Sequence, residues 1–548
     1  MSKLVRVCFF VIGLLLTMQH SFAEEGVRGR LVDTSWLARN LKSSDLVLLD
    51  ASPETYGKGH IPGAQSVNIY DLFAYGFGGI SDSKIEEDFR SWGVGPEKKI
   101  VMYDSGGQEL ATRLFFDLDY HGVPEQNLFI LDGGLSKWKK EALPLSTERV
   151  PSPKNGTFKL TKLNEDLRGG LPEVLDATGD TTHNALLEGL GPDWHYGQIA
   201  PFSKAGHIPT GILTPVGDFY NADKTFKSPK EIRQMLTFLG VKEEQQIYTY
   251  CGGGVAATVP YFAAKYVAGY PKVKLYPESE LGWLNDERGL PYWTYDEPYL
   301  MRETNWLQFW SSQMIRSFLG APVSVVDLRP QAEFNQGHIP YSLNISSEVF
   351  RANVTTPEKL AEILGPAGVH ASDEAVVVSG AGLTKDSALA YVMLENLGQK
   401  KVSMFMDSMD TWTKRGQHLV KDPTVVGPKK APHDPAIVPI SYPSNAGTDV
   451  LINSPRAGQD PYPVVFVASG KELAAKSQNG KTVHVNYADL LNADGTPKAA
   501  KDIWTALEKA GVPRYAQLIC VSDDPGEAAV NYFILKLMGF RDVKVLVS

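Results

Sequence analysis

The tetrapeptide Gly-His-Ile-Pro occurs three times in this 548-residue chain, at long and unequal spacing. The copies are Gly59–Pro62, Gly206–Pro209 and Gly337–Pro340. A short apolar run that ends in Asp precedes each copy, namely Leu46–Asp50, Val174–Asp176 and Val323–Asp327. A helical pattern, a second buried strand and a loop follow each copy. Repetition with so long a period predicts several modules of one topology.

The alternation of strands and helices predicts parallel βαβ units with right-handed crossovers, and hence an α/β fold. Each module is expected to be a mainly parallel sheet with helices on both faces. The predicted division is a signal peptide (1–23), three modules (24–149, 150–300 and 301–421), a linker (422–463) and a degenerate fourth module (464–548). The linker holds nine prolines, so we expect it to be stiff and extended.

The first residues have the three parts of a secretory signal peptide. Lys3 and Arg6 precede the apolar run Val7–Met18, and Ser21-Phe22-Ala23 follows it. Because the run is too short to span a bilayer stably, we expect an exported, periplasmic or secreted protein without a membrane span in its mature part. The formal net charge of −9 becomes −11 without Lys3 and Arg6, which argues against nucleic acid or anionic lipid as a partner.

One cysteine stands where chemistry is expected. The β-branched and aromatic run Ile247–Tyr250 breaks at Cys251 into three glycines, Gly252–Gly254, and a helical pattern begins at Val255. Cys251 is therefore predicted at the carboxyl end of a buried strand, where open α/β sheets bind ligands. Consecutive glycine N–H groups and the following helix would form a cup for an anion and stabilise a thiolate. The alternative is a small buried Cys beside a glycine turn.

The second thiol has a different setting. Only Cys251 and Cys520 remain in the predicted mature chain, so no disulfide framework is expected. The sequence around Cys520, Ala516–Val521, is typical of the interior of a buried strand. We therefore expect Cys520 to pack as a small apolar side chain.

The strand, the Cys, the loop C-G-G-G-V-A and the helix together resemble the active loop of the rhodanese family, most nearly that of the mercaptopyruvate sulfurtransferases. Trp283 with Gly289 and Pro291 is similar to the family's closing pattern, and Gly-His-Ile-Pro is a family mark upstream. The resemblance covers nearly all of the chain. It implies tandem rhodanese-like modules, Cys251 as the catalytic residue, and no metal or cofactor. It also implies a substrate-binding loop made of Gly252, Gly253, Gly254, Val255 and Ala256.

The corresponding loops of the other modules lack this cysteine. Asp104 stands at its place in module one, Ser379 in module three, and Ser522 in module four. A carboxylate cannot accept sulfur and would repel an anion, and no base is apparent that would activate Ser379. We expect modules one and three to be inactive.

Module two also departs from the family pattern. The family's Arg two residues after the strand Asp is replaced by Thr178, the loop carries no Lys or Arg, and its usual hydroxyl is replaced by Ala256, although Thr258 could supply one. These changes favour a donor other than thiosulfate. The long stretch Thr178–Ala205 is interpreted as an extended loop, which either forms a wall of the substrate pocket or is a surface excursion.

The sequence thus predicts an exported sulfurtransferase. It would move a sulfane sulfur from a small sulfur-containing anion (thiosulfate, mercaptopyruvate or a related chalcogen compound) through a Cys251 persulfide to cyanide or a thiol. The alternative is a largely non-catalytic protein whose rhodanese modules bind a chalcogen oxyanion or a protein partner. A cysteine phosphatase would need an Arg where Ala257 stands. The repeated His is expected to shape a turn and not to bind a metal.

Overall fold

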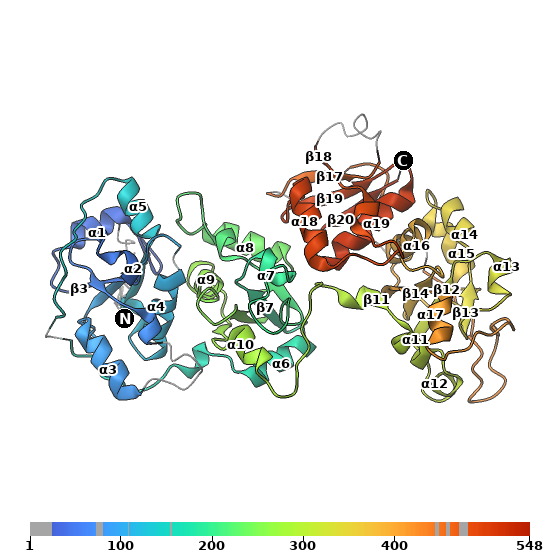
Figure 1. The fold of residues 1–548 in the computed structure, drawn as a ribbon, viewed down its shortest axis with the longest axis horizontal. Coiled ribbons are helices and arrows are strands. Elements are labelled where there is room, and N and C mark those ends of the chain that lie inside the picture. The colour runs from blue at the N-terminus through green and yellow to red at the C-terminus, as the bar shows by residue number, and fades with distance from the viewer. Residues whose placement is uncertain are drawn as a thin grey trace, which may run out of the picture. The chain divides into compact units, whose positions relative to one another are not determined.

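The structure is a computed structural model that describes residues 25–72, 81–107, 109–153, 156–443, 449–455, 461–470 and 480–547. The predicted signal peptide lies outside these residues. The chain divides into two compact units. The first comprises the described residues up to Asn164 together with Asn221–Phe226, and the second comprises Glu165–Tyr220 and the described residues from Lys227 onward. Four sheets are present in the described part of the chain (Figure 1).

The first unit holds one six-stranded sheet, in the order β1-β2-β6-β5-β3-β4. Only the β1–β2 pair is antiparallel. The strands are β1 (Val27–Arg28), β2 (Leu31–Val32), β3 (Leu46–Asp50), β4 (Gln65–Ser66), β5 (Lys99–Tyr103) and β6 (Leu128–Leu131). The helices are α1 (Thr34–Asn40), α2 (Pro53–Tyr56), α3 (Asp82–Ser91), α4 (Glu109–Tyr120) and α5 (Gly134–Lys140).

The second unit begins with the cysteine-bearing module, whose sheet has the order β10-β9-β7-β8. Its strands are β7 (Asn184–Glu188), β8 (Gly211–Leu213), β9 (Gln246–Tyr250) and β10 (Val273–Leu275). Its helices are α6 (Leu171–Gly179), α7 (Pro192–His195), α8 (Pro229–Phe238), α9 (Thr258–Phe262) and α10 (Ser279–Leu284), and a π-helical segment, Ala263–Val267, continues α9.

The third sheet has the order β11-β15-β14-β12-β13, and the fourth has the order β16-β20-β19-β17-β18. The third-sheet strands are β11 (Met301–Arg302), β12 (Val323–Asp327), β13 (Ser342–Asn344), β14 (Glu374–Val378) and β15 (Lys401–Phe405). The fourth-sheet strands are β16 (Leu451–Ile452), β17 (Val464–Ala468), β18 (Lys481–His484), β19 (Gln517–Val521) and β20 (Val543–Leu546). The helices here are α11 (Thr304–Trp310), α12 (Gln313–Phe318), α13 (Gln331–Phe334), α14 (Ser347–Ala352), α15 (Ala361–Leu364), α16 (Lys385–Asn396), α17 (Met409–Lys414), α18 (Ala500–Ala510) and α19 (Pro525–Leu537).

All four sheets share one strand order. If the five parallel positions of a sheet are numbered along the chain, each sheet runs 1-5-4-2-3. In the cysteine module the first position is reduced to a single parallel bridge between Arg168 and Leu275. The predicted α/β fold with mainly parallel sheets is therefore confirmed. Strand β16 lies inside the segment interpreted as the proline-rich linker, where it pairs with β20.

One predicted strand is wrong. Val174–Asp176 belongs to helix α6, and the strand that precedes the second Gly-His-Ile-Pro is β7, which ends at Glu188. The residues from Thr178 to Ala205 therefore include β7 and α7 and are not one long loop. The position two residues after the strand's acidic end is Leu190 and not Thr178. A three-residue apolar run fits a helix face as well as a strand, so length alone could not decide.

The Gly-His-Ile-Pro histidines play the same structural part in three modules. The His ring stacks on the ring of an earlier residue: His60 on Tyr56, His207 on His195, and His338 on Phe334. In each case the Nδ1 atom also contacts the backbone carbonyl of that residue, at 2.9–3.0 Å. The His backbone pairs with the segment that closes its module. These contacts agree with a turn-forming role.

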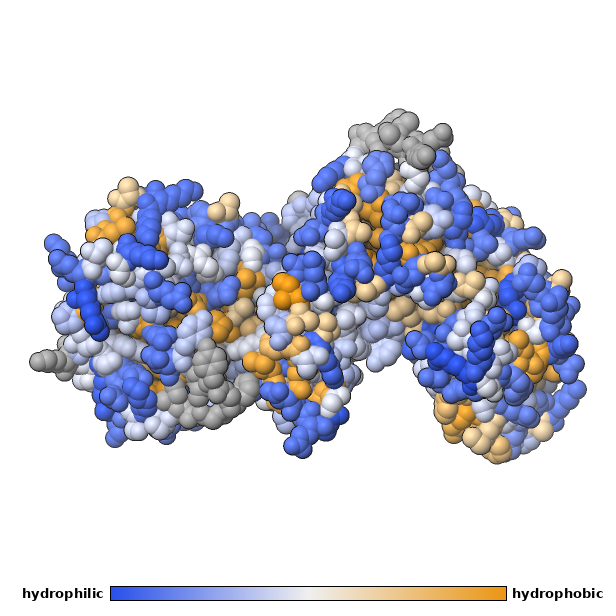
Figure 2. All heavy atoms as spheres, viewed as in Figure 1, coloured by the Kyte–Doolittle hydropathy of each residue, from blue (hydrophilic) through white to orange (hydrophobic). Residues whose placement is uncertain are grey.

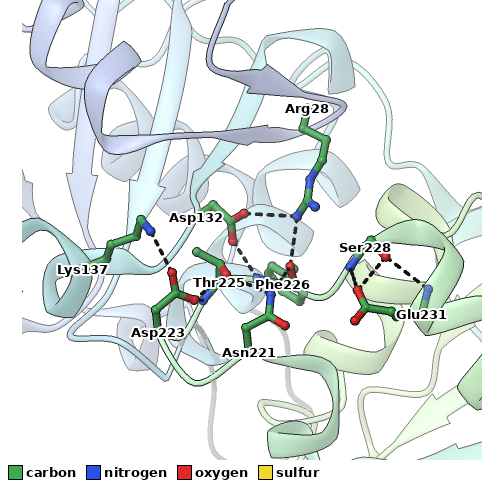
Figure 3. A network of polar contacts seen from close by, with 9 residues as sticks. All are labelled: Arg28, Asp132, Lys137, Asn221, Asp223, Thr225, Phe226, Ser228 and Glu231. Carbon is green, nitrogen blue, oxygen red and sulfur yellow. Dashed lines mark hydrogen bonds and ion pairs between the residues drawn. The ribbon is translucent and has the colours of Figure 1, made fainter. Parts of the chain in front are cut away.

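A turn of the second module's sequence, Asn221–Phe226, belongs to the first unit (Figure 3). Asp223 forms an ion pair with Lys137 at 2.8 Å, and the Phe226 N–H group donates to Asp132 at 2.8 Å. Module four repeats the turn as Asn492–Thr496, with the same side-chain hydrogen bonds between its Asn, Asp and Thr. The module-four turn contacts module three, because the Leu383 N–H group donates to the Gly495 carbonyl.

Modules three and four share one apolar core, in which α16 faces α19. Figure 2 shows apolar residues gathered around α12 on the face that is drawn, where Met314, Phe318 and Leu319 are about two-thirds exposed or more. Among the described helices, none has the length and apolar character needed to cross a bilayer.

Candidate active site at the cysteine loop

Cys251 follows β9 directly and is buried, with 2% of its surface exposed. Its Sγ atom accepts the N–H group of Gly254 at 3.1 Å, and its own N–H group donates to the Ser279 hydroxyl at 3.0 Å. Gly254 has φ +83°, and a Cβ atom there would lie 2.3 Å from the Pro277 carbonyl oxygen. Only glycine fits this position, and its N–H group is thereby aimed at the sulfur.

Ser279 is a site residue that the sequence did not indicate. Its hydroxyl oxygen lies 4.0 Å from the Cys251 Sγ atom and donates to the Tyr276 carbonyl at 3.0 Å. The backbone of Ser279 is left-handed, with φ +52°, a conformation that a residue with a Cβ atom rarely adopts. In module one the corresponding residue is Gly134, with φ +55°. The second module thus places a hydroxyl beside the thiol despite the backbone strain.

The electrostatic setting differs from the prediction of a stabilised thiolate at the rim of the loop. Burial raises the pKa of the Cys251 thiol, and the N–H groups of Ala257, Gly253 and Gly254 and the Ser279 hydroxyl offset this only in part. Desolvation disfavours the charged form more strongly than the N–H cup favours it. Helix α9 begins at Thr258, has five residues and then turns into the π-helical segment, so its dipole adds little. The resting thiol is therefore protonated at neutral pH.

Apolar side chains cover the loop. A Cβ atom placed on Gly252 would lie 3.2 Å from the Phe202 ring, and one on Gly253 would lie 3.4 Å from the Leu281 side chain. The Trp194 ring lies 6.4 Å from that of Phe202, measured between centroids. Phe202 lies on an insertion, because the stacked pair His195–His207 is twelve residues apart and the pairs in modules one and three are four apart. Of the two alternatives for this stretch, the contact between Phe202 and Gly252 favours a wall of the substrate site.

A buried polar cluster lies behind the loop. His195 forms an ion pair with Glu188 through Nδ1 and with Asp296, at 3.0 Å, through Nε2. Burial alone would lower the pKa of His195, but Asp296 and Glu188 raise it to about 9. His195 is therefore a cation at neutral pH. Next to it, burial and then the charge of His195 lower the pKa of His207 to about 3, so this stacked ring is neutral.

Glu280 joins this cluster to the cysteine loop. Its N–H group donates to the Cys251 carbonyl at 3.0 Å. Its side chain is buried near Glu188 and Tyr292, and burial followed by the charge of Glu188 raises its pKa to about 9. Glu280 is thus a neutral acid in the resting site. The cluster could not be read from sequence spacing, because its members lie up to 108 residues apart.

Glu188, His195 and His207 lie close enough to be considered as metal ligands. Both nitrogens of His195 already contact carboxylates, and the contact with Glu188 leaves no room for an ion between them. The two imidazole rings are parallel, 3.6 Å apart, so their lone pairs do not converge. The unpartnered Nε2 atom of His207 recurs at His60 and His338 and is a property of the repeated turn. The cluster therefore does not fit a tetrahedral metal site.

In the other modules, the side chain at the position of Cys251 forms hydrogen bonds within its own loop region. The Asp104 carboxylate accepts the N–H groups of Gly106, Leu110 and Ala111 at 2.8–3.2 Å. Ser379 donates to the Gly382 carbonyl at 2.6 Å, and Ser522 donates to Glu527 at 2.8 Å. Arg329, the family-type Arg in module three, is paired with Asp327. Cys520 lies inside β19 with no exposed surface, and burial raises its pKa strongly.

The comparisons with known proteins point to one family. The Rhodanese model, "Rhodanese-like domain", matches residues 33–141 and 313–415, which lie in modules one and three. The chain is 28% identical to the sulfur carrier protein TtuD of Thermus thermophilus over 271 residues, 46% of this chain and 93% of that protein. It is 30% identical to a thiosulfate sulfurtransferase of Pseudomonas aeruginosa over 263 residues, 46% of this chain and 94% of that protein.

Among solved structures, the 3-mercaptopyruvate sulfotransferase SseA of Escherichia coli covers 46% of this chain and 99% of its own length. The sequence identity is 24% and the TM-score is 0.42. The match to the Pseudomonas aeruginosa protein spans 94% of that protein at 30% identity, and two segments of this chain match the family model. Together these matches establish the family of this chain. The chain belongs to the rhodanese family.

Proposed function

We propose that the protein is a sulfurtransferase in which Cys251 carries the transferred sulfur. The observation that carries the proposal is the Cys251 thiol held against loop N–H groups in a chain of the rhodanese family. The N–H groups that now face Sγ can hold a persulfide in the same cup. The names of the relatives support thiosulfate or mercaptopyruvate as donors and sulfur transfer as the reaction class.

The reaction has two half-reactions. In the first, Cys251 attacks the sulfane sulfur of the donor, a sulfur–sulfur bond forms at Cys251, and the rest of the donor leaves with the bonding electron pair. In the second, cyanide or a thiol attacks the outer sulfur and leaves as thiocyanate or as a persulfide, and the Cys251 thiol is restored. Glu280 N–H holds the Cys251 backbone in place through both steps.

The alternative, a binding protein with four anion cups, has less support. In module one the Asp104 carboxylate already takes up the N–H groups that an oxyanion would need, and Ser379 is bonded within its own loop.

The test is the intact mass of the purified protein after incubation with thiosulfate or mercaptopyruvate. We expect a gain of one sulfur atom that is lost on adding cyanide, and no gain in a Cys251→Ser variant. A protein whose mass never changes with any sulfane donor would refute the proposal.

Export is part of the proposal, because residues 1–23 have the pattern of a signal peptide. The full chain should appear in the exported fraction of an expressing bacterium and lose these residues, and a variant that lacks them should stay in the cytoplasm. Full-length mass in the cytoplasmic fraction would contradict export.

A further inference from the structure

The surroundings of the Cys251 loop select among sulfane donors. Three large apolar side chains lie close to it: Phe202 against Gly252, Leu281 against Gly253, and Trp194 beside Phe202. Phe202 comes from the insertion that modules one and three lack. Leu281, on α10, is 36% exposed and is therefore accessible to a ligand. An entering donor would therefore meet aromatic and aliphatic surface before it reaches the sulfur.

The same surroundings offer little to a doubly charged donor. The groups that lower the Cys251 pKa are backbone N–H groups and a hydroxyl, all uncharged. The loop Gly252–Ala256 contains no Lys or Arg. Two basic side chains of this module, Arg168 and Lys204, are engaged elsewhere, Arg168 with Glu278 and Lys204 with the Leu290 carbonyl. Behind the loop, the cation His195 is already paired with Glu188 and Asp296, so it offers no free positive charge to a dianion.

We infer, on the basis of the proposed function, that the donor carries its sulfane sulfur on a group with at most one negative charge and an apolar, preferably aromatic, part. The apolar part would pack against Phe202, Trp194 and Leu281, and the loop N–H groups would donate hydrogen bonds to the singly charged group. Burying an aromatic ring in such a site strengthens binding by about tenfold to a hundredfold.

The step balances without any further reactant. With an organic thiosulfonate, the Cys251 thiol attacks the outer sulfur, the bond between that sulfur and the sulfonyl sulfur breaks, and a sulfinate leaves with the electron pair. Cys–SH and R–SO2–S⁻ thus become Cys–S–SH and R–SO2⁻. With thiosulfate the same step releases sulfite as a dianion.

Three donors with the same reacting sulfur test the inference: benzenethiosulfonate, methanethiosulfonate and thiosulfate. The measurement is kcat/KM for sulfur transfer to cyanide, divided for each donor by its rate with free N-acetylcysteine. We expect benzenethiosulfonate to exceed methanethiosulfonate by about tenfold or more, and thiosulfate to be the poorest of the three.

Variants locate the effect. Phe202→Ala should lower the ratio of benzenethiosulfonate to methanethiosulfonate about tenfold, whereas the control Phe309→Ala, at an exposed position on α11, should not change it. Leu281→Arg should raise the value for thiosulfate relative to benzenethiosulfonate about tenfold, because it supplies a cation at the loop, and Leu281→Gln should not.

The outcomes separate this inference from the proposed function. If none of the donors places a sulfur atom on Cys251 in a folded protein, the proposed function fails. If all three load Cys251 with normalised rates that are equal, or if thiosulfate is preferred, the function stands and the inference about the donor is overturned. Ratios that do not respond to Phe202→Ala or Leu281→Arg also overturn it.

Discussion

Modules one and two have the same backbone hydrogen bond at the loop after the central strand, but different side chains occupy that loop. In both, the residue after the central strand offers its carbonyl to the first helix of the closing segment: Asp104 to the Leu135 N–H group at 2.9 Å, and Cys251 to that of Glu280 at 3.0 Å. In module one the Asp104 carboxylate then takes the N–H groups of the loop. In module two the Cys251 thiol receives only hydrogen bonds that leave it uncharged at rest. Module one keeps the fold without the cysteine, because the Asp104 carboxylate can accept the loop N–H groups in place of a bound anion.

A second contrast lies under the loop. Module one stacks its repeated His on Tyr56 and module three on Phe334, but module two stacks it on His195, which two buried carboxylates hold in its charged form. Asp296, one of these two, lies in the segment that closes the module, where it approaches Gly539 of module four. Both ion pairs of His195 are therefore internal to the cysteine module, and module one has the phenol ring of Tyr56 at the equivalent place.

The largest effect on stability is expected when His195 of module two is replaced by an aromatic residue of the kind found at this place in modules one and three. His195→Phe leaves Glu188 and Asp296 buried without their cation and should lower the free energy of unfolding of the second unit by about 3–5 kcal/mol at pH 7. The His195 pKa is raised in the folded state, so its contribution is complete below the unfolded pKa and is lost as pH rises through about 9. The difference in unfolding free energy between the wild type and the variant should therefore decrease as the pH rises from about 6.5 to about 9.

Denaturant midpoints at these two pH values check the prediction. Tyr56→Phe, the matched change in module one, should leave the pH dependence as it is in the wild type. A His195→Phe protein with the wild-type midpoint and pH profile would show that the ion pairs contribute nothing to stability.

The next effect concerns the filled cup of module one. Asp104→Ala removes the acceptor of three N–H groups and should cost about 1–3 kcal/mol of unfolding free energy. Asp104→Asn, which keeps one acceptor oxygen, should cost less. Thermal melts with and without sulfate sharpen the comparison, because sulfate should stabilise Asp104→Ala more than the wild type. Equal stabilisation of both proteins would mean that the carboxylate does not occupy an anion site.

Module two can also be given the glycine of module one at the strained position. Ser279→Gly relieves the left-handed backbone but removes the hydroxyl beside the sulfur, so sulfur transfer should fall about tenfold while the free energy of unfolding stays within about 1 kcal/mol. Ser279→Ala should lose as much activity and be less stable than Ser279→Gly, because the strain remains. Full activity in either variant would remove Ser279 from the site.

The smallest effect is predicted for grafts. Cys in place of Asp104 or Ser379, in a Cys251→Ala background, should give little sulfur transfer. The N–H groups that Asp104 gathers come from Gly106, Leu110 and Ala111, and those around Cys251 come from Gly253, Gly254 and Ala257, so the two cups are spaced differently along the chain. A graft with wild-type rates of persulfide formation would show that the thiol alone distinguishes the modules.

The repeat pattern and the cysteine loop could be predicted because they are local. Strands β3, β9 and β12 each combine a short apolar run with turn residues, and the Gly-His-Ile-Pro turns have one sequence. Strand β7 was not predicted because it ends in Glu188, whereas the corresponding strands of modules one and three end in Asp. The residues Val174–Asp176 have the expected sequence pattern but belong to helix α6.

The remaining errors have a three-dimensional origin. The Cys251 pKa depends on burial, which a loop sequence rich in glycine does not reveal. The pairing of His195 with Asp296 joins residues 101 positions apart, and Ser279 reaches the sulfur across 28 positions. Such contacts depend on how the strands are ordered in the sheet, and single-chain periodicity carries no information about them.

The central claim is that Cys251 alone carries the sulfur, and two serine variants test it most directly. Cys251→Ser should form no persulfide, and its hydroxyl can keep the hydrogen bond from Gly254, so the fold should remain. Cys520→Ser should transfer sulfur normally but lose about 1–3 kcal/mol of unfolding free energy, because its hydroxyl is buried within β19. Sulfur transfer and denaturant midpoint are to be measured for both. An inactive Cys520→Ser protein of normal stability would contradict the account and require a relay of two thiols.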